Sequence, residues 1–166
     1  GTQQVNSTTR WYDTANGGTV NDSPTIYKDG HKLHFQQQTT GFKVDYTGAN
    51  ALNATAYFFD GTYLEFSHDA SEVSFNGGDI EVTANSVFKV KHKSGTLTLN
   101  GSGKLLLNDQ TLQILGTDAN YSHAIGDLDF DLNVVGGGLI VLNNMLDETY
   151  NFNALTQDFT GTIKAD

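Results

Sequence analysis

The chain has 166 residues, with 19 Asp and Glu against 9 Lys and Arg, a formal net charge of −10, and no Cys. Without Cys, disulfides and thiolate metal sites are excluded, and no apolar run of about 18 residues is present that would cross a membrane as a helix. The net negative charge argues against nucleic acid as a partner, because each neutralised phosphate needs a cation.

The composition predicts one β-domain over residues 1–166. Charged residues make up only 17% of the chain, which is below the usual quarter. Thr, Asn, Ser, Gln and Gly supply the polarity instead, and these residues suit strands and turns. Residues 1–30 are rich in turn residues and predict an irregular N-terminal cap with one or two short strands, and residues 31–166 predict the strand scaffold.

From residue 31 onward, apolar side chains recur at every second position, which predicts short strands rather than helices. Residues 49–57 are the exception, since small alanines beside a leucine permit one or two helical turns there. The expected strands are 33–35, 42–46, 63–66, 72–75, 79–82, 87–90, 96–99, 104–107, 111–115, 121–125, 128–132, 139–142, 149–152 and 162–165.

Strands at this spacing fit two architectures. One is a right-handed parallel β-helix, a solenoid with three strands in each rung of about 25 residues. The other is an antiparallel sandwich or jelly roll. Grouped as rungs 62–86, 87–110, 111–138 and 139–166, the solenoid predicts three inward columns of stacked side chains. These are Leu64–Phe88–Leu112–Ile140, Val73–Leu97–Ala124–Tyr150 and Ile80–Leu105–Leu128–Ile163.

Two segments carry a resemblance to a known group of proteins. Gly136–Asn144 (GGGLIVLNN) and Phe159–Ile163 (FTGTI) resemble rungs of β-helical bacterial surface proteins. Autotransporter passengers and the pectate-lyase-like regions of Gram-positive adhesins are similar over roughly residues 60–166. The resemblance implies adhesion or glycan binding at an extracellular, cell-surface or cell-wall location, within a larger surface protein. It brings no catalytic motif.

Asp127, Asp129 and Asp131 alternate along one expected strand, so their carboxylates share a face. Alternate positions lie about 7 Å apart, so all three cannot chelate one ion directly. Two of them could hold Ca²⁺ together with oxygens of a neighbouring strand. The row could also accept hydrogen bonds from sugar hydroxyls, or simply form a solvated face. Ca²⁺ is the only cofactor that the sequence suggests.

Lys89, Lys91 and Lys93 likewise share one face of a strand, inside a segment, 82–108, that contains no acid. Such a basic strip could bind an acidic glycan or a cell-wall polymer. It could equally be a solvated face, or protect a sheet edge from aggregation.

Trp11, Tyr12 and Asp13 form a candidate sugar platform. Aromatic rings stack on the apolar faces of pyranoses while a carboxylate binds hydroxyls. The alternative is that Trp11 packs over an open end of the β-core as a cap.

Catalysis has little support in the sequence. The chain has no G-x-S-x-G motif, no phosphate-binding loop and no H-E-x-x-H pair. We therefore expect a non-catalytic domain of a secreted or cell-surface bacterial adhesin that binds glycans, mucin or host extracellular matrix. The alternatives are a structural stalk or spacer, and a small polysaccharide-active enzyme.

Overall fold

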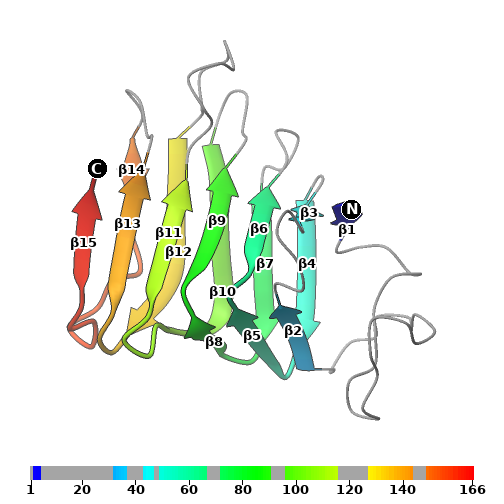
Figure 1. Cartoon of the computed structure of the whole chain (residues 1–166), viewed down its shortest axis with the longest axis horizontal. Helices are drawn as coiled ribbons and strands as arrows, with labels where there is room; N and C mark the ends of the chain where they lie inside the picture. The colour runs from blue at the N-terminus through cyan, green and yellow to red at the C-terminus, as the bar shows by residue number, and fades with distance from the viewer. Residues whose placement is uncertain are drawn as a thin grey trace.

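The computed structural model describes residues 2–4, 32–36, 43–46, 49–66, 72–90, 96–115, 127–143 and 149–166. Within these residues the chain is all-β, with no helix. Every strand pairing between them is parallel, and the strands stack side by side along one axis (Figure 1). The expectation of a parallel β-helix is confirmed, and the antiparallel sandwich is not the fold.

Seven strands form one sheet of the solenoid, in the order β1-β3-β6-β9-β11-β13-β15. Their bounds are β1 Thr2–Gln4, β3 Lys43–Tyr46, β6 Tyr63–Phe66, β9 Ser86–Val90, β11 Thr111–Leu115, β13 Leu139–Asn143 and β15 Thr162–Ala165.

The other eight strands form a second sheet that is bent into two columns. Their bounds are β2 Lys32–Gln36, β4 Ala49–Ala54, β5 Ala56–Asp60, β7 Glu72–Gly77, β8 Ile80–Ala84, β10 Thr96–Leu106, β12 Asp127–Val135 and β14 Tyr150–Asn151. The long strand β10 joins the columns, because its first half pairs with β7 and its second half with β8. Each complete rung therefore presents three sides, as the sequence predicts.

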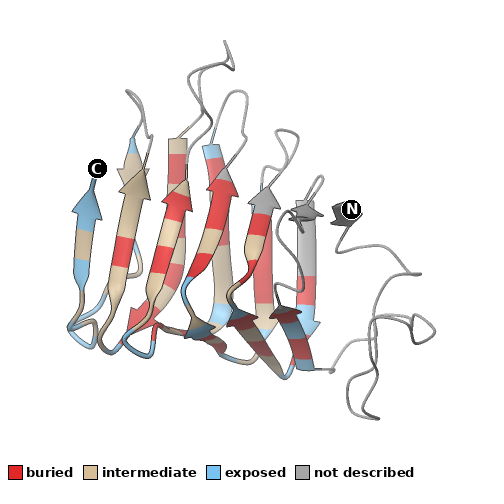
Figure 2. Ribbon diagram, viewed as in Figure 1, coloured by how far each residue is buried: buried red, intermediate tan, exposed pale blue. Residues whose placement is uncertain are grey.

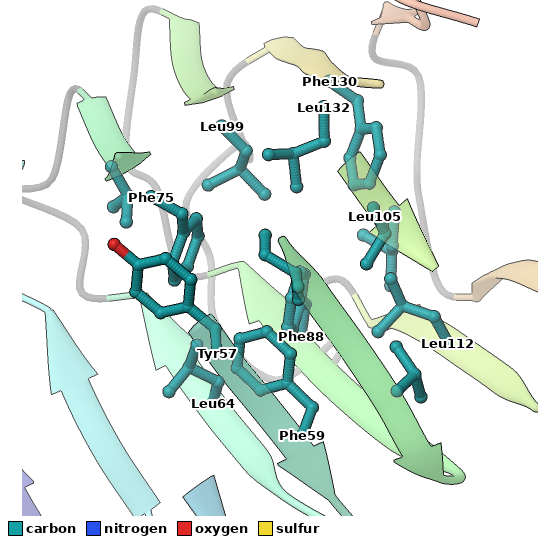
Figure 3. Close-up of a cluster of buried hydrophobic side chains, with 14 of the residues drawn as sticks. Tyr57, Phe59, Leu64, Phe75, Phe88, Leu99, Leu105, Leu112, Phe130 and Leu132 are labelled. Atoms are coloured by element: carbon teal, nitrogen blue, oxygen red, sulfur yellow. The ribbon is translucent and has the colours of Figure 1, made fainter. Parts of the chain in front are cut away.

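Alternate side chains of the strands point into one core. The burial pattern of β11 and most of β12 alternates residue by residue, and the buried residues appear as separate bands along β9 and β11 (Figure 2). The inward side chains of all three columns meet in a single cluster (Figure 3). Alternation in the sequence thus places the apolar side chains in the interior, and their burial is the main contribution to the stability of the fold.

Aromatic rings fill one part of this interior. Phe59 makes edge-to-face contacts with Phe75 and Phe88, at centroid distances of 5.9 and 5.3 Å. Tyr57 is fully buried, and its hydroxyl donates to the Asn76 carbonyl at 2.6 Å. It also accepts from the Ala54 amide at 3.1 Å, so this phenol satisfies backbone groups at a corner.

The predicted columns are right at three steps and displaced at others. Leu64 lies beside Phe88, Ile80 beside Leu105 and Leu112 beside Ile140, as expected. Phe88 then lies beside Ile114 rather than Leu112.

The remaining predicted neighbours are also replaced. The observed pairs are Leu112 with Ser86, Val73 with Leu99, Leu97 with Leu128, Leu105 with Val134, and Ile163 with Ile140; Ala124 lies outside the described residues. A slip of two residues keeps the same side chains inward, so periodicity alone leaves such slips open. In addition, Leu128 and Ile163 lie on other sides of the rung than predicted, beside Leu97 and Ile140 respectively, because periodicity does not say which strand stacks on which.

Residues 49–57 form β4 and the start of β5, so the expected helical turns are wrong. Leu52 and Ala54 point into the core with Tyr57, and parallel pairing with β7 and β8 overrides the local helix propensity of the alanines. At the N-terminus, β1 lies inside the predicted cap, while residues 5–30 lie outside the described part of the chain.

The corner between the two columns of the second sheet, where β7 is followed by β8, is built from glycines that stack on the preceding rung. A Cβ at Gly78 would lie 1.8 Å from the Thr55 carbonyl oxygen, and one at Gly103 would lie 2.2 Å from the Gly78 oxygen. Only glycine lets successive backbones approach this closely. The column of corners therefore restricts the sequence as tightly as the core does.

Neighbouring positions on β11 separate the core from the surface. We expect Leu112→Ala to reduce the free energy of unfolding by about 2–5 kcal/mol, because Leu112 is fully buried and its loss leaves a cavity. Gln113→Ala, one residue further on and pointing outward, should change it by about 0.5 kcal/mol or less. Urea unfolding of both variants measures the contrast, and equal effects would contradict the assigned inward face.

Two glycine substitutions separate steric from conformational cost. Gly103 does not have a left-handed φ, so Gly103→Ala tests close approach alone, and we expect a loss of about 3 kcal/mol. Gly136 has a φ of +80° and nothing within 4 Å of a built Cβ, so Gly136→Ala tests conformation alone, at about 1 kcal/mol. Urea unfolding measures both, and a larger effect at Gly136 would contradict the stacked corner.

Candidate functional site

The solenoid presents three outward faces with different chemistry, since parallel pairing places equivalent positions of successive rungs side by side. The polar face consists of the outward residues of β7, of the first halves of β10 and β12, and of β14. The mixed face consists of the outward residues of β2, β5 and β8 and of the second halves of β10 and β12. The apolar face consists of the outward residues of β6, β9, β11 and β13.

From β7 to β14, the outward residues of the polar face carry hydrogen-bonding side chains, whereas β4 on the same side places Ala49 and Ala51 beside Glu72 and Ser74. Its rows follow from the register, in which Thr96, Thr98 and Asn100 lie beside the three aspartates of β12. Its members are Glu72, Ser74, Thr96, Thr98, Asn100, Asp127, Asp129, Asp131, Thr149, Asn151 and Asn153.

Hydrogen bonds between rungs hold the aspartate row in place. Asn151 Nδ2 donates to Asp129 Oδ1 at 2.8 Å, and Asn153 Nδ2 donates to Asp131 Oδ1 at 2.8 Å. The backbone amide of Thr149 donates to Asp127 Oδ1 at 3.0 Å. Each of the three carboxylates thus accepts a hydrogen bond from the following rung, and the acceptor sites that remain on each are available to a ligand.

Glu72 is oriented in the same way at the other side of β10. Its Oε1 accepts from Asn100 Nδ2 at 2.9 Å and from Ser74 Oγ at 3.0 Å. These two hydrogen bonds, with that from Asn100 the stronger, hold the pKa of the Glu72 carboxyl below its usual range. The negative form of the Glu72 carboxyl is thereby favoured.

The aspartate row does not assemble a metal centre in the described structure. Asp127, Asp129 and Asp131 lie where the sequence predicts, on one face of β12. Within the described ranges, no group of three or more His, Asp or Glu side chains is close enough to hold a metal ion. The Ca²⁺ hypothesis stays a prediction, since it needs only two of the aspartates together with oxygens of a neighbouring strand.

The mixed face carries an aromatic pair that the sequence did not single out. His34 on β2 stacks on Phe58 of β5, with ring centroids 4.4 Å apart and planes 18° apart. His34 is exposed, and the same row continues to Glu81 and Leu106. The two residues are 24 positions apart in the sequence, so only the rung register reveals that they touch.

The apolar face contains the one member of the predicted basic strip that the structure describes. Lys89 is only 9% exposed and lies between Glu65 and Leu115 in the register of β9. The side chain of Lys89 is thus largely covered, and its role in binding a ligand stays a prediction. Lys91 and Lys93 lie outside the described residues.

The proposed sugar platform of Trp11, Tyr12 and Asp13 also lies outside the described residues. What the sequence missed on the polar face is the set of partners, above all Asn151 and Asn153. In the sequence, the only sign of this pairing is that Asn151 and Asn153 have the same alternate spacing as Asp129 and Asp131, which lie 22 residues earlier.

Comparisons with protein-family models, with curated proteins and with solved structures give no match to the chain. Among the described residues no helix is long and apolar enough to span a membrane.

The orientation of Glu72 can be tested by titration. Asn100→Ala removes its first hydrogen-bond donor, and we expect the pKa of Glu72 to rise toward its usual value. Because the folded pKa of Glu72 is lowered, its contribution to stability is present above the unfolded pKa and is lost as the pH falls through the folded pKa. Carboxyl carbon NMR measures the shift. Asn151→Ala, whose partner is Asp129, should leave the pKa of Glu72 unchanged.

Proposed function

We propose that the chain is a non-catalytic domain of a secreted or cell-surface bacterial adhesin that binds carbohydrate through its polar face. The observation that supports this best is the oriented row of Asp127, Asp129 and Asp131, each held through one oxygen by the following rung. Sugars are recognised through many hydroxyl groups, and carboxylates and amides at fixed positions are suited to accept from and donate to them.

Preorganisation strengthens the case for this face. A flexible carboxylate loses rotamer freedom when it binds a ligand, which reduces affinity. The bonds from Asn151 and Asn153 restrict the aspartates before any ligand arrives. Rows repeat rung by rung along the axis, so the face suits an extended glycan rather than a single small sugar.

A structural spacer is the alternative function. The same hydrogen bonds between rungs would also stiffen a stalk, and a stalk needs no ligand. Binding experiments separate the two proposals, because a spacer predicts no glycan binding at any face.

We expect Asp129→Asn together with Asp131→Asn to weaken glycan binding by about thirtyfold. A hydrogen bond to a charged acceptor contributes more than one to a neutral acceptor, by about 1 kcal/mol for each residue. Both amides can keep Oδ1 as an acceptor, so the fold should be retained. A glycan array with neutral, acidic and mucin-type glycans identifies ligands, and calorimetry measures the affinities.

Asp158→Asn is the matched control, since Asp158 is exposed in the turn that follows β14 and lies away from the row. It should bind as the unmodified chain does. Uniform absence of binding across the array would reject the carbohydrate proposal and favour the spacer. Equal loss in the control would show that general charge, rather than the polar face, determines affinity.

A further inference from the structure

The polar face carries charge of one sign. Its acids are Glu72, Asp127, Asp129 and Asp131. Among the outward residues of this face that the structure describes there is no Lys or Arg, and Lys89 and Lys104 lie on the apolar and mixed faces. Fixed charges of one sign raise the local concentration of groups of the opposite sign, so this face attracts positively charged groups.

The hydrogen-bonding capacity of the face is equally one-sided. Each amide side chain on it donates an N–H group to a carboxylate of the same face. The pairs are Asn100 with Glu72, Asn151 with Asp129 and Asn153 with Asp131, at 2.9, 2.8 and 2.8 Å. An ionised carboxylate only accepts, at about four lone-pair sites. Each of these carboxylates therefore keeps acceptor sites, and the face offers a ligand more acceptors than donors.

An ammonium group complements such a surface, since it supplies three donors, no acceptor and a positive charge. The hydrogen bonds from Asn100 and Ser74 lower the pKa of the Glu72 carboxyl, which keeps it ionised at mildly acidic pH, where sugar amines are protonated. Carboxylate or sulfate groups of an acidic glycan bring the wrong charge. Hydroxyl groups of a neutral glycan bring donors without charge.

We infer that the polar face selects a glycan with free amino groups, whose ammonium groups bind to the carboxylates of Glu72 and the aspartate row. This inference rests on the proposed function and names the class of sugar that the face takes. A single exposed ion pair contributes little, and alternate carboxylates of a strand lie about 7 Å apart. Several amino groups must therefore bind at once, which favours a polymer of amino sugars over a single one.

Calorimetry with one glucosamine oligosaccharide in three forms tests the inference. At low salt and mildly acidic pH, we expect the free-amine form to bind about tenfold more tightly than the N-acetylated form, and the N-sulfated form to bind most weakly. Asp129→Asn together with Asp131→Asn should reduce this preference, and Asp158→Asn, away from the row, should keep it. Equal affinities for the free-amine and N-acetylated forms would overturn the inference.

A salt series on the unmodified chain covers the case in which the double variant fails to fold. Affinity for the free-amine form should fall as salt rises, because salt screens exposed charges, and affinity for the N-acetylated form should not. A salt-independent affinity for the free-amine form would contradict the inference, as would a lysine peptide of equal charge that binds as tightly as the sugar. If other glycans bind and the free-amine form does not, this inference fails and the proposed function stands. Absence of binding to every glycan rejects the proposed function itself.

Discussion

Parallel stacking of one rung on the next is the constraint on which the rest of this structure depends. Each strand bonds to the equivalent strand of the neighbouring rung, and inward side chains such as Leu112 and Ile140 lie over one another. The core is thus built from columns rather than from isolated contacts. Any residue that cannot fit both the rung before it and the rung after it disturbs two interfaces at once.

The same constraint explains why the surface is divided by chemistry. Because outward positions also stack, a row keeps its character over several rungs, as the aspartates of β12 do beside Thr98 and Asn100. Hydrogen bonds then run along the axis between side chains, in addition to those of the backbone. Order on the polar face follows from the fold itself, since 4.8 Å spacing brings amide and carboxylate groups within bonding distance.

Much of this could be predicted from the sequence, and the limit has a clear physical cause. Alternation predicted the strands and the inward side chains, and Asp127, Asp129 and Asp131 lie on one face as expected. The register could not be predicted, because sliding a strand by two residues preserves its inward face. The partners Asn151 and Asn153 and the stacked pair His34–Phe58 depend on register, so they emerge only from the structure. The burial of Lys89 was missed for a related reason, since an outward position can still be covered by its neighbours.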